Sequence, residues 1–444
     1  MARSPLLFLL GLALTWPVAA TGAADRAVVA KARQMAGEIQ AAVSQLRGLP
    51  VRRKLKTDIY SQADLRTFIV GQLSHKGGRK HLALRSRALR ALGALPPDFE
   101  LLGGMTGLLD EQVAGLYDPG SRKLRIMARL VPMGEEVWSP LELLTGSPTD
   151  RARFVLAHEI VHALQDQHYN LRHLGRDRRG ESDLETALAS LFEGDATAAG
   201  LAFMIADRGG YDEVGFFATA NMMAWMMKGA MSLASLGLLP DTAKLRATPK
   251  LLQQRLIFPY VGGLSMCMKA GQAGGWPAID ALYRDPPLST EQVLHPRKLL
   301  GKQRDYPQVL KLPDLRRTLG RPYALRYTDT LGELGVRTLL EDAPAGVDAA
   351  QAAAGWDGDR YVLYGAKGRP DVLVWLSTWD SPEEAAEFAG ALARWMALRH
   401  ATDARLDVRG ADVLVQLGVA PASHGVLRDR IWRHTKRRER RRLP

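Results

Sequence analysis

The stretch that most limits how this chain can fold is FVLAHEIVHALQ (154–165), in which polar side chains interrupt an apolar helical sequence. Residues four apart on a helix lie about 40° apart on one face, so His158 and His162 can direct their rings at one point. A solvated helix with two incidental histidines is the alternative. The apolar flanks argue against it, because a helix packed into a core needs partners for its histidines. We therefore predict a buried helix whose histidines bind one metal ion.

Glu159 lies between these histidines, where its carboxylate can reach a water molecule on such an ion. Catalytic zinc sites use three protein ligands and keep one position for water, whose pKa the ion lowers. A neighbouring carboxylate can take the proton of that water as the water attacks a carbonyl. The HExxH pattern thus predicts a zinc-dependent hydrolase with Glu159 as the general base.

The third zinc ligand is His168 or a residue further along the chain. His168 has the spacing of the metzincin pattern HExxHxxGxxH, but Gln165 stands where that pattern has the glycine that lets the chain leave the helix. On a continuing helix, His168 lies about 240° around and roughly 9 Å along from His162. Glu193 lies in the apolar middle of a helical stretch (184–203), where an unpaired carboxylate is costly. We therefore predict Glu193 as the third ligand.

Two aspartates are candidates for orienting the ligand histidines. Asp195 is the other charge in the apolar stretch, and it lies about 200° from Glu193 on an ideal helix, so both cannot face one ion. Carboxylates often hold the second ring nitrogen of a ligand histidine. Asp195 could do so, as could Asp166.

At these residues the sequence resembles the gluzincins, zinc metallopeptidases in which HExxH is followed by a glutamate on a later helix. FEGDAT (192–197) is similar to the Glu-Gly-x-Ala element that carries the third ligand in membrane-alanyl aminopeptidases. The resemblance implies that His158, His162 and Glu193 bind zinc and that Glu159 is the base. The hairpin GLYDPGSRKLRIM would match the edge strand that binds an extended peptide in such enzymes. The Gly-x-Met-Glu-Asn element that grips a free amino terminus is absent from the sequence, which favours an endopeptidase.

A looser resemblance covers most of the chain after its first 24 residues. HALQDQH, EGDAT, FPYVGG, PPLSTEQVLHP and GWDGDRY are similar to segments of an uncharacterised family of exported bacterial and archaeal proteins with metallopeptidase motifs. This resemblance supports the zinc site and implies no particular substrate.

A peptidase also needs a group that stabilises the oxyanion of the transition state. Tyr260 in FPYVGG and His295 in STEQVLHP are the candidates. Glu291 lies one helical turn before His295 and could orient its ring, which favours His295.

The main alternative function is a non-catalytic, zinc-stabilised scaffold that binds envelope proteins. Glu159 favours the enzyme, because a purely structural zinc site needs no base beside an open position. We therefore expect a peptide or protein as the substrate.

The first 24 residues have the pattern of a secretory signal. A single arginine precedes an apolar run from Leu6 to Trp16, and small residues follow that suit cleavage between Ala20 and Ala24. A retained amino-terminal anchor is the alternative. The sequence predicts an exported protein, periplasmic or extracellular.

The single cysteine and the basic end of the chain limit other roles. One thiol, Cys267, excludes an internal disulfide and a multi-cysteine metal cluster, and its apolar neighbours predict burial. Nine basic residues lie in 426–444, which contributes much of the net charge of +13. We expect a disordered tail that could contact an anionic surface, and no nucleic acid partner in an exported protein.

The fold class predicted from these patterns is α+β and mainly helical, with a zincin-like metallopeptidase core. The apolar segment 216–239 contains Asn221 and Lys228 and is predicted as a buried helix. Strand and helix patterns after Ala345 predict a small β-β-α-β module. The expected parts are a signal peptide (1–24), a helical region (25–100), the metallopeptidase domain (101–344), the small α/β module (345–425) and the tail (426–444).

Overall fold

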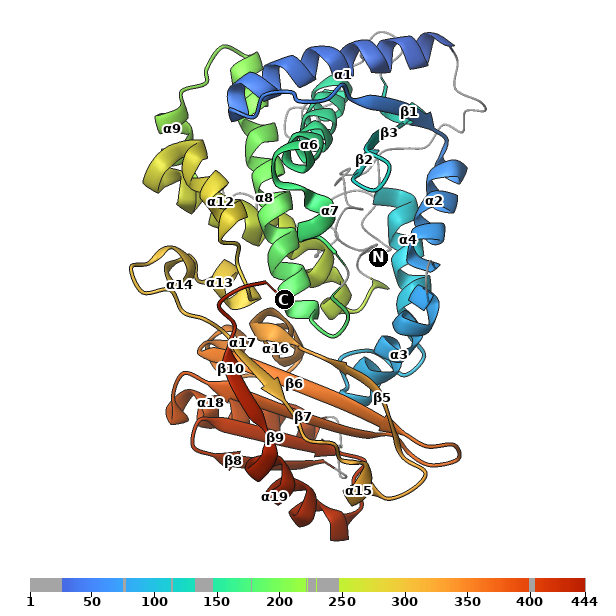
Figure 1. Ribbon diagram of the computed structural model, residues 1–444, viewed down its shortest axis with the longest axis vertical. Helices are drawn as coiled ribbons and strands as arrows, with labels where there is room; N and C mark the ends of the chain where they lie inside the picture. Colours follow the sequence, from blue (N-terminus) through green and yellow to red (C-terminus); the bar gives the residue numbers. More distant parts are fainter. Residues whose placement is uncertain are drawn as a thin grey trace.

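The computed structural model describes residues 26–74, 77–112, 115–131, 147–176, 178–220, 222, 229, 247–398 and 404–443. The predicted signal and most of the apolar segment 216–239 lie outside these residues. The prediction of a mainly helical α+β fold is confirmed (Figure 1). Cys267 is buried, as predicted.

Helices form most of the first three hundred residues. They are α1 (Arg26–Arg47), α2 (Gln62–Ser74), α3 (Gly78–Ala91), α4 (Leu101–Gln112), α6 (Pro148–Tyr169), α7 (Leu171–Leu174), α8 (Ser182–Asp207), α9 (Glu213–Ala218), α12 (Lys250–Arg284), α13 (Thr290–Leu294) and α14 (Pro296–Leu300). α1 lies across the ends of α6 and α8 (Figure 1).

A three-stranded sheet accompanies these helices. Its strands are β1 (Lys56–Tyr60), β2 (Gly115–Asp118) and β3 (Lys123–Met127), in the order β1-β3-β2. The predicted hairpin is confirmed: β2 and β3 are antiparallel, and Asp118 closes the turn by accepting from the backbone N–H of Gly120 and Ser121. β1 pairs parallel with β3, so the region 25–100, expected to be purely helical, contributes a strand to this sheet.

α8 is the central helix of the protein. By length and composition it is the one described helix that could cross a membrane, but 83% of its apolar window is buried inside the protein, as in a core helix. It packs closely against α12 because two glycines meet there. A Cβ built on Gly194 would lie 2.1 Å from the backbone of Gly263, and any side chain at either glycine would force the helices apart.

The rest of the chain forms a five-stranded antiparallel sheet in the order β5-β6-β7-β9-β8. Its strands are β5 (Ala324–Asp329), β6 (Trp356–Gly365), β7 (Val372–Trp379), β8 (Arg405–Arg409) and β9 (Asp412–Leu417). Alternate residues of β6 and β7 enter two hydrophobic clusters, so both faces of these strands are buried. The accompanying elements are β4 (Gln308–Lys311), α15 (Arg316–Leu319), α16 (Gly332–Leu340), α17 (Ala349–Ala353), α18 (Pro382–Leu398), α19 (His424–His434) and β10 (Lys436–Glu439).

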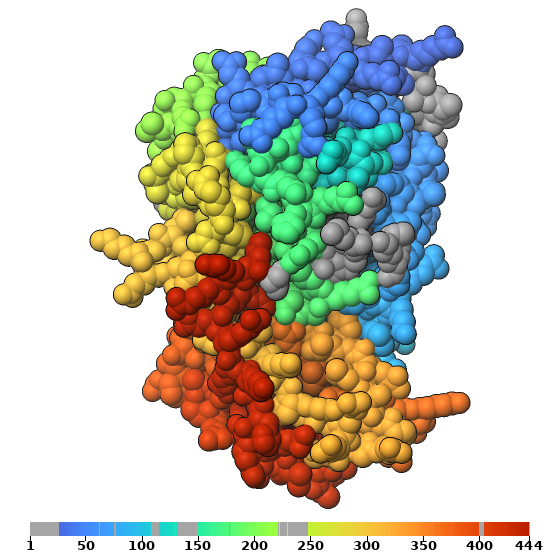
Figure 2. Space-filling view, viewed as in Figure 1, coloured from blue at the N-terminus to red at the C-terminus, as the bar shows by residue number. Residues whose placement is uncertain are grey.

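Two predictions about this part of the chain need correction. The sheet begins at Ala324, earlier than the expected boundary, and β5 and β8 extend the predicted β-β-α-β pattern. The basic tail, predicted to be disordered, is ordered through residue 443. Leu427 and Ile431 of α19 are buried against the sheet, and β10 pairs with β4. Figure 2 shows the last residues lying across the junction between the helical part and the sheet.

Candidate metal centre

α6 holds the two histidines of the HExxH segment. A capping box starts this helix: the Ser147 hydroxyl accepts from the backbone N–H of Asp150, and the Asp150 carboxylate accepts from that of Ser147. Because α6 is straight through the segment, His158 and His162 lie one turn apart on its buried face. Both rings point toward α8.

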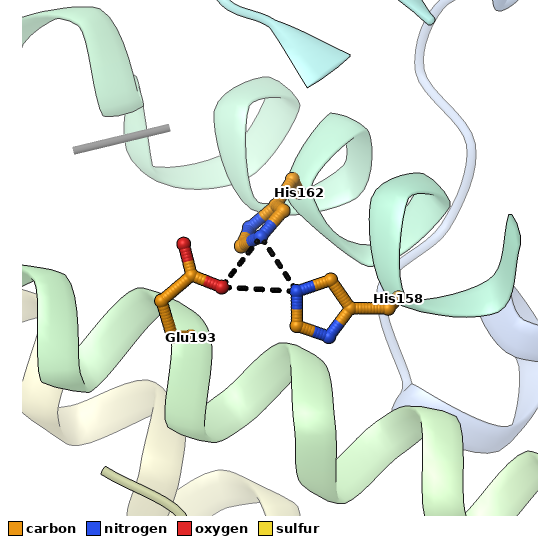
Figure 3. A group of neighbouring side chains, drawn as sticks. All are labelled: His158, His162 and Glu193. Carbon is orange, nitrogen blue, oxygen red and sulfur yellow. Dashed lines mark hydrogen bonds and ion pairs between the residues drawn. The ribbon is translucent and has the colours of Figure 1, made fainter. Parts of the chain in front are cut away.

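Glu193 of α8 completes a group of three ligand atoms (Figure 3). Its Oε2 lies 2.9 Å from Nε2 of His158 and 3.3 Å from Nε2 of His162, and the two histidine nitrogens are 3.1 Å apart. An ion 2.0–2.2 Å from tetrahedral ligands holds them roughly 3.3–3.5 Å apart. The three atoms therefore have nearly the spacing that a zinc ion requires.

Gln165 determines which nitrogen of His162 carries the proton. Its amide Nε2 donates to the carbonyl of Phe192 (3.1 Å) and to Asp195 Oδ2 (2.9 Å), so its Oε1 must face His162 Nδ1, at 2.9 Å. An amide oxygen only accepts, and the proton therefore lies on Nδ1. In the neutral ring, the lone pair of Nε2 is thus left to face Glu193 and the metal position.

Asp195 lies next to Gln165 and accepts several buried hydrogen bonds. Arg47 of α1 donates to both of its oxygens, at 2.7 and 3.3 Å, and the Tyr283 hydroxyl donates to Oδ2 at 2.7 Å. Arg47 also pairs with Asp280. Asp195 thus does not hold a ring nitrogen of His162 directly, as predicted from the sequence, but reaches His162 through the Gln165 amide.

Asp166 and His168 lie away from the ligand atoms. Asp166 accepts from the Tyr117 hydroxyl at 2.9 Å and has Arg53 at 3.8 Å. Neither contact is with a ligand histidine. His168 directs Nε2 to the carbonyl of Pro50, at 2.8 Å, and the structure does not bring it to the group of three.

Glu159 is held beside the ligand group by strand β2. Its Oε2 accepts from the backbone N–H of Tyr117 at 2.6 Å, and its side chain is buried. Burial raises the pKa of Glu159 to about 8, although the positive charge of His162 opposes this. A carboxyl group with a pKa near neutrality can both take and return a proton.

Contact between Glu193 and His162 shifts the pKa values of both groups, whereas burial lowers the pKa of His158. Burial lowers the pKa of His162, but Glu193 outweighs burial and the value rises to about 9. Burial raises the pKa of Glu193, but His162 and His158 outweigh it and the value falls to about 2. A proton on His162 thus occupies the place that a metal cation would take between these atoms.

Of the two candidates for stabilising an oxyanion, Tyr260 lies at the site. Its ring stacks on His158, with centroids 5.8 Å apart, and its buried hydroxyl lies near Glu193 without a hydrogen bond of normal geometry among the described residues. Burial raises the Tyr260 pKa well above its usual value, and the charges of Glu193 and Glu159 add to this. The hydroxyl therefore keeps its proton and can donate it in a hydrogen bond.

His295 has a different environment from the one predicted. It pairs with Glu333 of α16 at 2.7 Å, and 41% of its side chain is exposed. Glu291, expected to orient its ring, instead pairs with Lys298 at 2.6 Å. That expectation is wrong because Lys298, seven residues later, brings a full positive charge to Glu291.

Sequence reasoning missed three contributors to this site. The contact of Gln165 with His162 could have been predicted, because Gln165 lies three residues after His162 on the same helical face. The contacts of Arg47 and Tyr117 could not have been predicted from local spacing. Arg47 lies 148 residues from Asp195 in the sequence, and Tyr117 lies 42 residues from Glu159.

Comparisons with known proteins assign no function. Residues 321–424 match a family described as a domain of unknown function (DUF8575), which covers β5 to β9 and the connecting elements. No curated protein and no solved structure matches the chain.

Proposed function

We propose that this protein is a zinc-dependent peptidase with a zincin-like core, in which Glu159 is the general base. The observation that supports it best is the convergence of three buried ligand atoms, from His158, His162 and Glu193, next to that carboxylate. A scaffold needs the ligands only. The presence of Glu159 and of the buried Tyr260 hydroxyl beside them favours catalysis.

The donor set fits zinc. Two neutral imidazole nitrogens and one carboxylate form the protein part of many catalytic zinc sites, and Gln165 already holds His162 in the metal-binding tautomer. A zinc ion held there would supply a Lewis acid and lower the pKa of a water molecule.

Residues of the chain would supply the general base, the hydrogen bond to the oxyanion and the strand that binds the peptide. Glu159, fixed by the Tyr117 N–H, takes a proton from the attacking water and gives it to the leaving amine. Tyr260 donates a hydrogen bond to the oxygen on which negative charge develops. β2 is an edge strand of its sheet among the described residues, so its backbone can pair with an extended peptide next to Glu159.

Substitution of the base tests this proposal. Glu159→Gln keeps the size of the side chain and leaves the ligands intact, so zinc content should stay near one per chain while hydrolysis of a peptide library falls by about 10²–10⁴-fold. His162→Ala should lose both zinc and activity. Glu38→Gln, on the exposed face of α1, is the matched control and should change neither.

Two results would contradict the proposal. Equal cleavage by the unmodified protein and Glu159→Gln would exclude Glu159 as the base. Bound zinc without any cleavage would favour the scaffold.

We also infer export from the sequence of residues 1–24. Amino-terminal sequencing of the protein from its native compartment should find a start between Ala20 and Ala24, and an intact Met1 would refute this.

A further inference from the structure

An apolar pocket opens from the candidate metal centre. Glu193 and Tyr260 line it at the centre, and Ser182 and Glu185 line it at the start of α8. Glu185 and Glu193 are eight residues apart on α8, so the pocket follows that helix for about 12 Å. Its remaining wall comes mainly from α3, α4 and α12. It includes a second, half-buried cation, Arg255, but most of it is apolar: Leu89, Leu101, Met105, Leu251, Leu252 and Leu256.

Arg85 of α3 also lines this pocket and is a buried cation for which the described residues provide no hydrogen bond or ion pair. Only 6% of it is exposed, and its Nε atom has no hydrogen bond. In the described part of the chain it forms no hydrogen bond and no ion pair within 4.0 Å. A buried charge that lacks such contacts is costly, so a protein rarely keeps one without a purpose.

The other buried arginines of the described residues differ from Arg85. Arg47, Arg125 and Arg360 pair with carboxylates at 2.7, 3.1 and 2.9 Å. Arg178 donates to the carbonyls of residues 174 and 176.

The two carboxylates whose charges act on Arg85, Asp329 and Glu185, already accept hydrogen bonds from other residues. Asp329 accepts from the backbone N–H and hydroxyl of Ser182 and from the Tyr327 hydroxyl, at 2.5–2.8 Å. Glu185 accepts from the backbone N–H of Arg178. Both act on Arg85 only through longer-range attraction. The guanidinium therefore remains available to a ligand that enters the pocket.

We propose that Arg85 binds a carboxylate of the substrate at the end of the pocket remote from the metal centre. A guanidinium matches a carboxylate in charge and shape, and the mostly apolar walls strengthen the attraction. The proposal rests on the proposed peptidase function for the nature of the ligand. The carboxylate belongs either to an acidic side chain or to the free carboxyl terminus of the peptide. An extended chain spans 12 Å in about three to four residues.

Paired peptides test the site. In the first series, each peptide with a free carboxyl terminus is paired with its amidated form. In the second series, each peptide with Glu is paired with the same peptide carrying Gln. In both series the varied group lies one to four residues from the scissile bond. The carboxylate member of the pair should have a kcat/KM about 10- to 100-fold higher, because hydrogen bonds to charged groups are worth about that factor. The series that shows the preference identifies the source of the carboxylate.

Three variants complete this experiment. Arg85→Met should reduce the preference to about one, and Arg85→Lys, which keeps a cation, should retain part of it even if Arg85→Met does not fold. Arg87→Met removes a cation of the same helix that pairs with Asp371 instead, and it should keep the full preference. A ratio near one in the unmodified protein for both series, or an unchanged ratio in Arg85→Met, would overturn the proposal.

A binding assay separates this proposal from the peptidase proposal. Fluorescence anisotropy with labelled peptides on the Glu159→Gln protein should give a Kd about 10- to 100-fold lower for the carboxylate member, and Arg85→Met should abolish the difference. This binding result, together with no hydrolysis by the unmodified protein, would support the Arg85 site and refute the peptidase. Hydrolysis together with equal binding of both members would refute the Arg85 site and leave the peptidase intact.

Discussion

Replacement of Gln165 by leucine should weaken zinc binding without removing a ligand. The Gln165 side chain is fully buried and satisfies three groups: His162 Nδ1–H, the carbonyl of Phe192 and one lone pair of Asp195. Leucine has a similar size but no polar atoms. Each buried group left unpaired costs about 1–3 kcal/mol, and Asp195 keeps its other donors, so the loss should be about 2–6 kcal/mol.

This loss divides between stability and metal affinity. The hydrogen bonds from Gln165 to the Phe192 carbonyl and to Asp195 stabilise the folded protein with or without metal. Their loss should therefore lower the unfolding temperature of the metal-free protein. The His162 part also frees the ring to change tautomer and orientation, which should lower zinc affinity by about 10- to 100-fold. Competition with a chromogenic chelator measures the affinity, and calorimetry measures the unfolding temperature.

Gln167→Leu is the matched control for this prediction. Gln167 lies two residues later on α6, and its Oε1 accepts from the backbone N–H of Arg52 and Arg53 rather than from a ligand histidine. This variant should retain full zinc affinity. Unchanged affinity in Gln165→Leu, or an equal decrease in both variants, would refute the tautomer role of Gln165.

Three further predictions concern the ligands, the oxyanion and pH. Glu193→Ala should abolish stoichiometric zinc binding and His168→Ala should not, as metal analysis can show; the reverse pattern would make His168 the third ligand. Tyr260→Phe should lower kcat by about 10²-fold or more and change KM little, and unchanged kcat in steady-state assays would exclude the hydroxyl from oxyanion binding. Burial raises the pKa of Asp183 to about 7 and that of Asp359 to about 6, from 3.8. The folded state therefore binds protons more tightly between pH 4 and 7, and stability should fall as the pH rises through that range. Melting at pH 5 and 7 should show this slope, and Asp183→Asn should flatten it; an equal slope in both proteins would refute this assignment.

The grouping of His158, His162 and Glu193 could be predicted from the sequence because local rules determine it. Helical spacing puts His158 and His162 on one face, and the cost of a lone carboxylate in an apolar helix singles out Glu193. The structure brings these three residues together. The contacts of Arg47 and Tyr117 could not be predicted, since they depend on how α1 and β2 pack on α6 and α8.

The basic tail shows why composition alone misled the prediction. A run of cations suggests a solvated segment, but Leu427 and Ile431, four residues apart, give α19 an apolar face. The cations also have partners from distant positions: Arg437 pairs with Asp412, and Arg440 pairs with Glu181. A one-dimensional charge count contains neither the buried face nor these partners.

The region that matches the family of unknown function has a physical connection with the proposed site. Its sheet holds the start of α8: Arg360 of β6 donates to the carbonyl of Gly180 and pairs with Glu181, and Asp329 of β5 accepts from Ser182. Glu193 lies eleven residues after Ser182 on the same rigid helix. A shift of the sheet along the axis of α8 would therefore displace the third ligand relative to α6.

The same contacts define the far end of the pocket. Asp329 lies close enough to attract Arg85 without pairing with it, because Ser182 and Tyr327 occupy its oxygens. If those donors were lost, Asp329 would attract Arg85 more strongly, and the carboxylate preference proposed for Arg85 should weaken. The sheet thus does more than add stability, since its contacts hold both the start of α8, which carries Glu193, and the aspartate whose charge acts on Arg85.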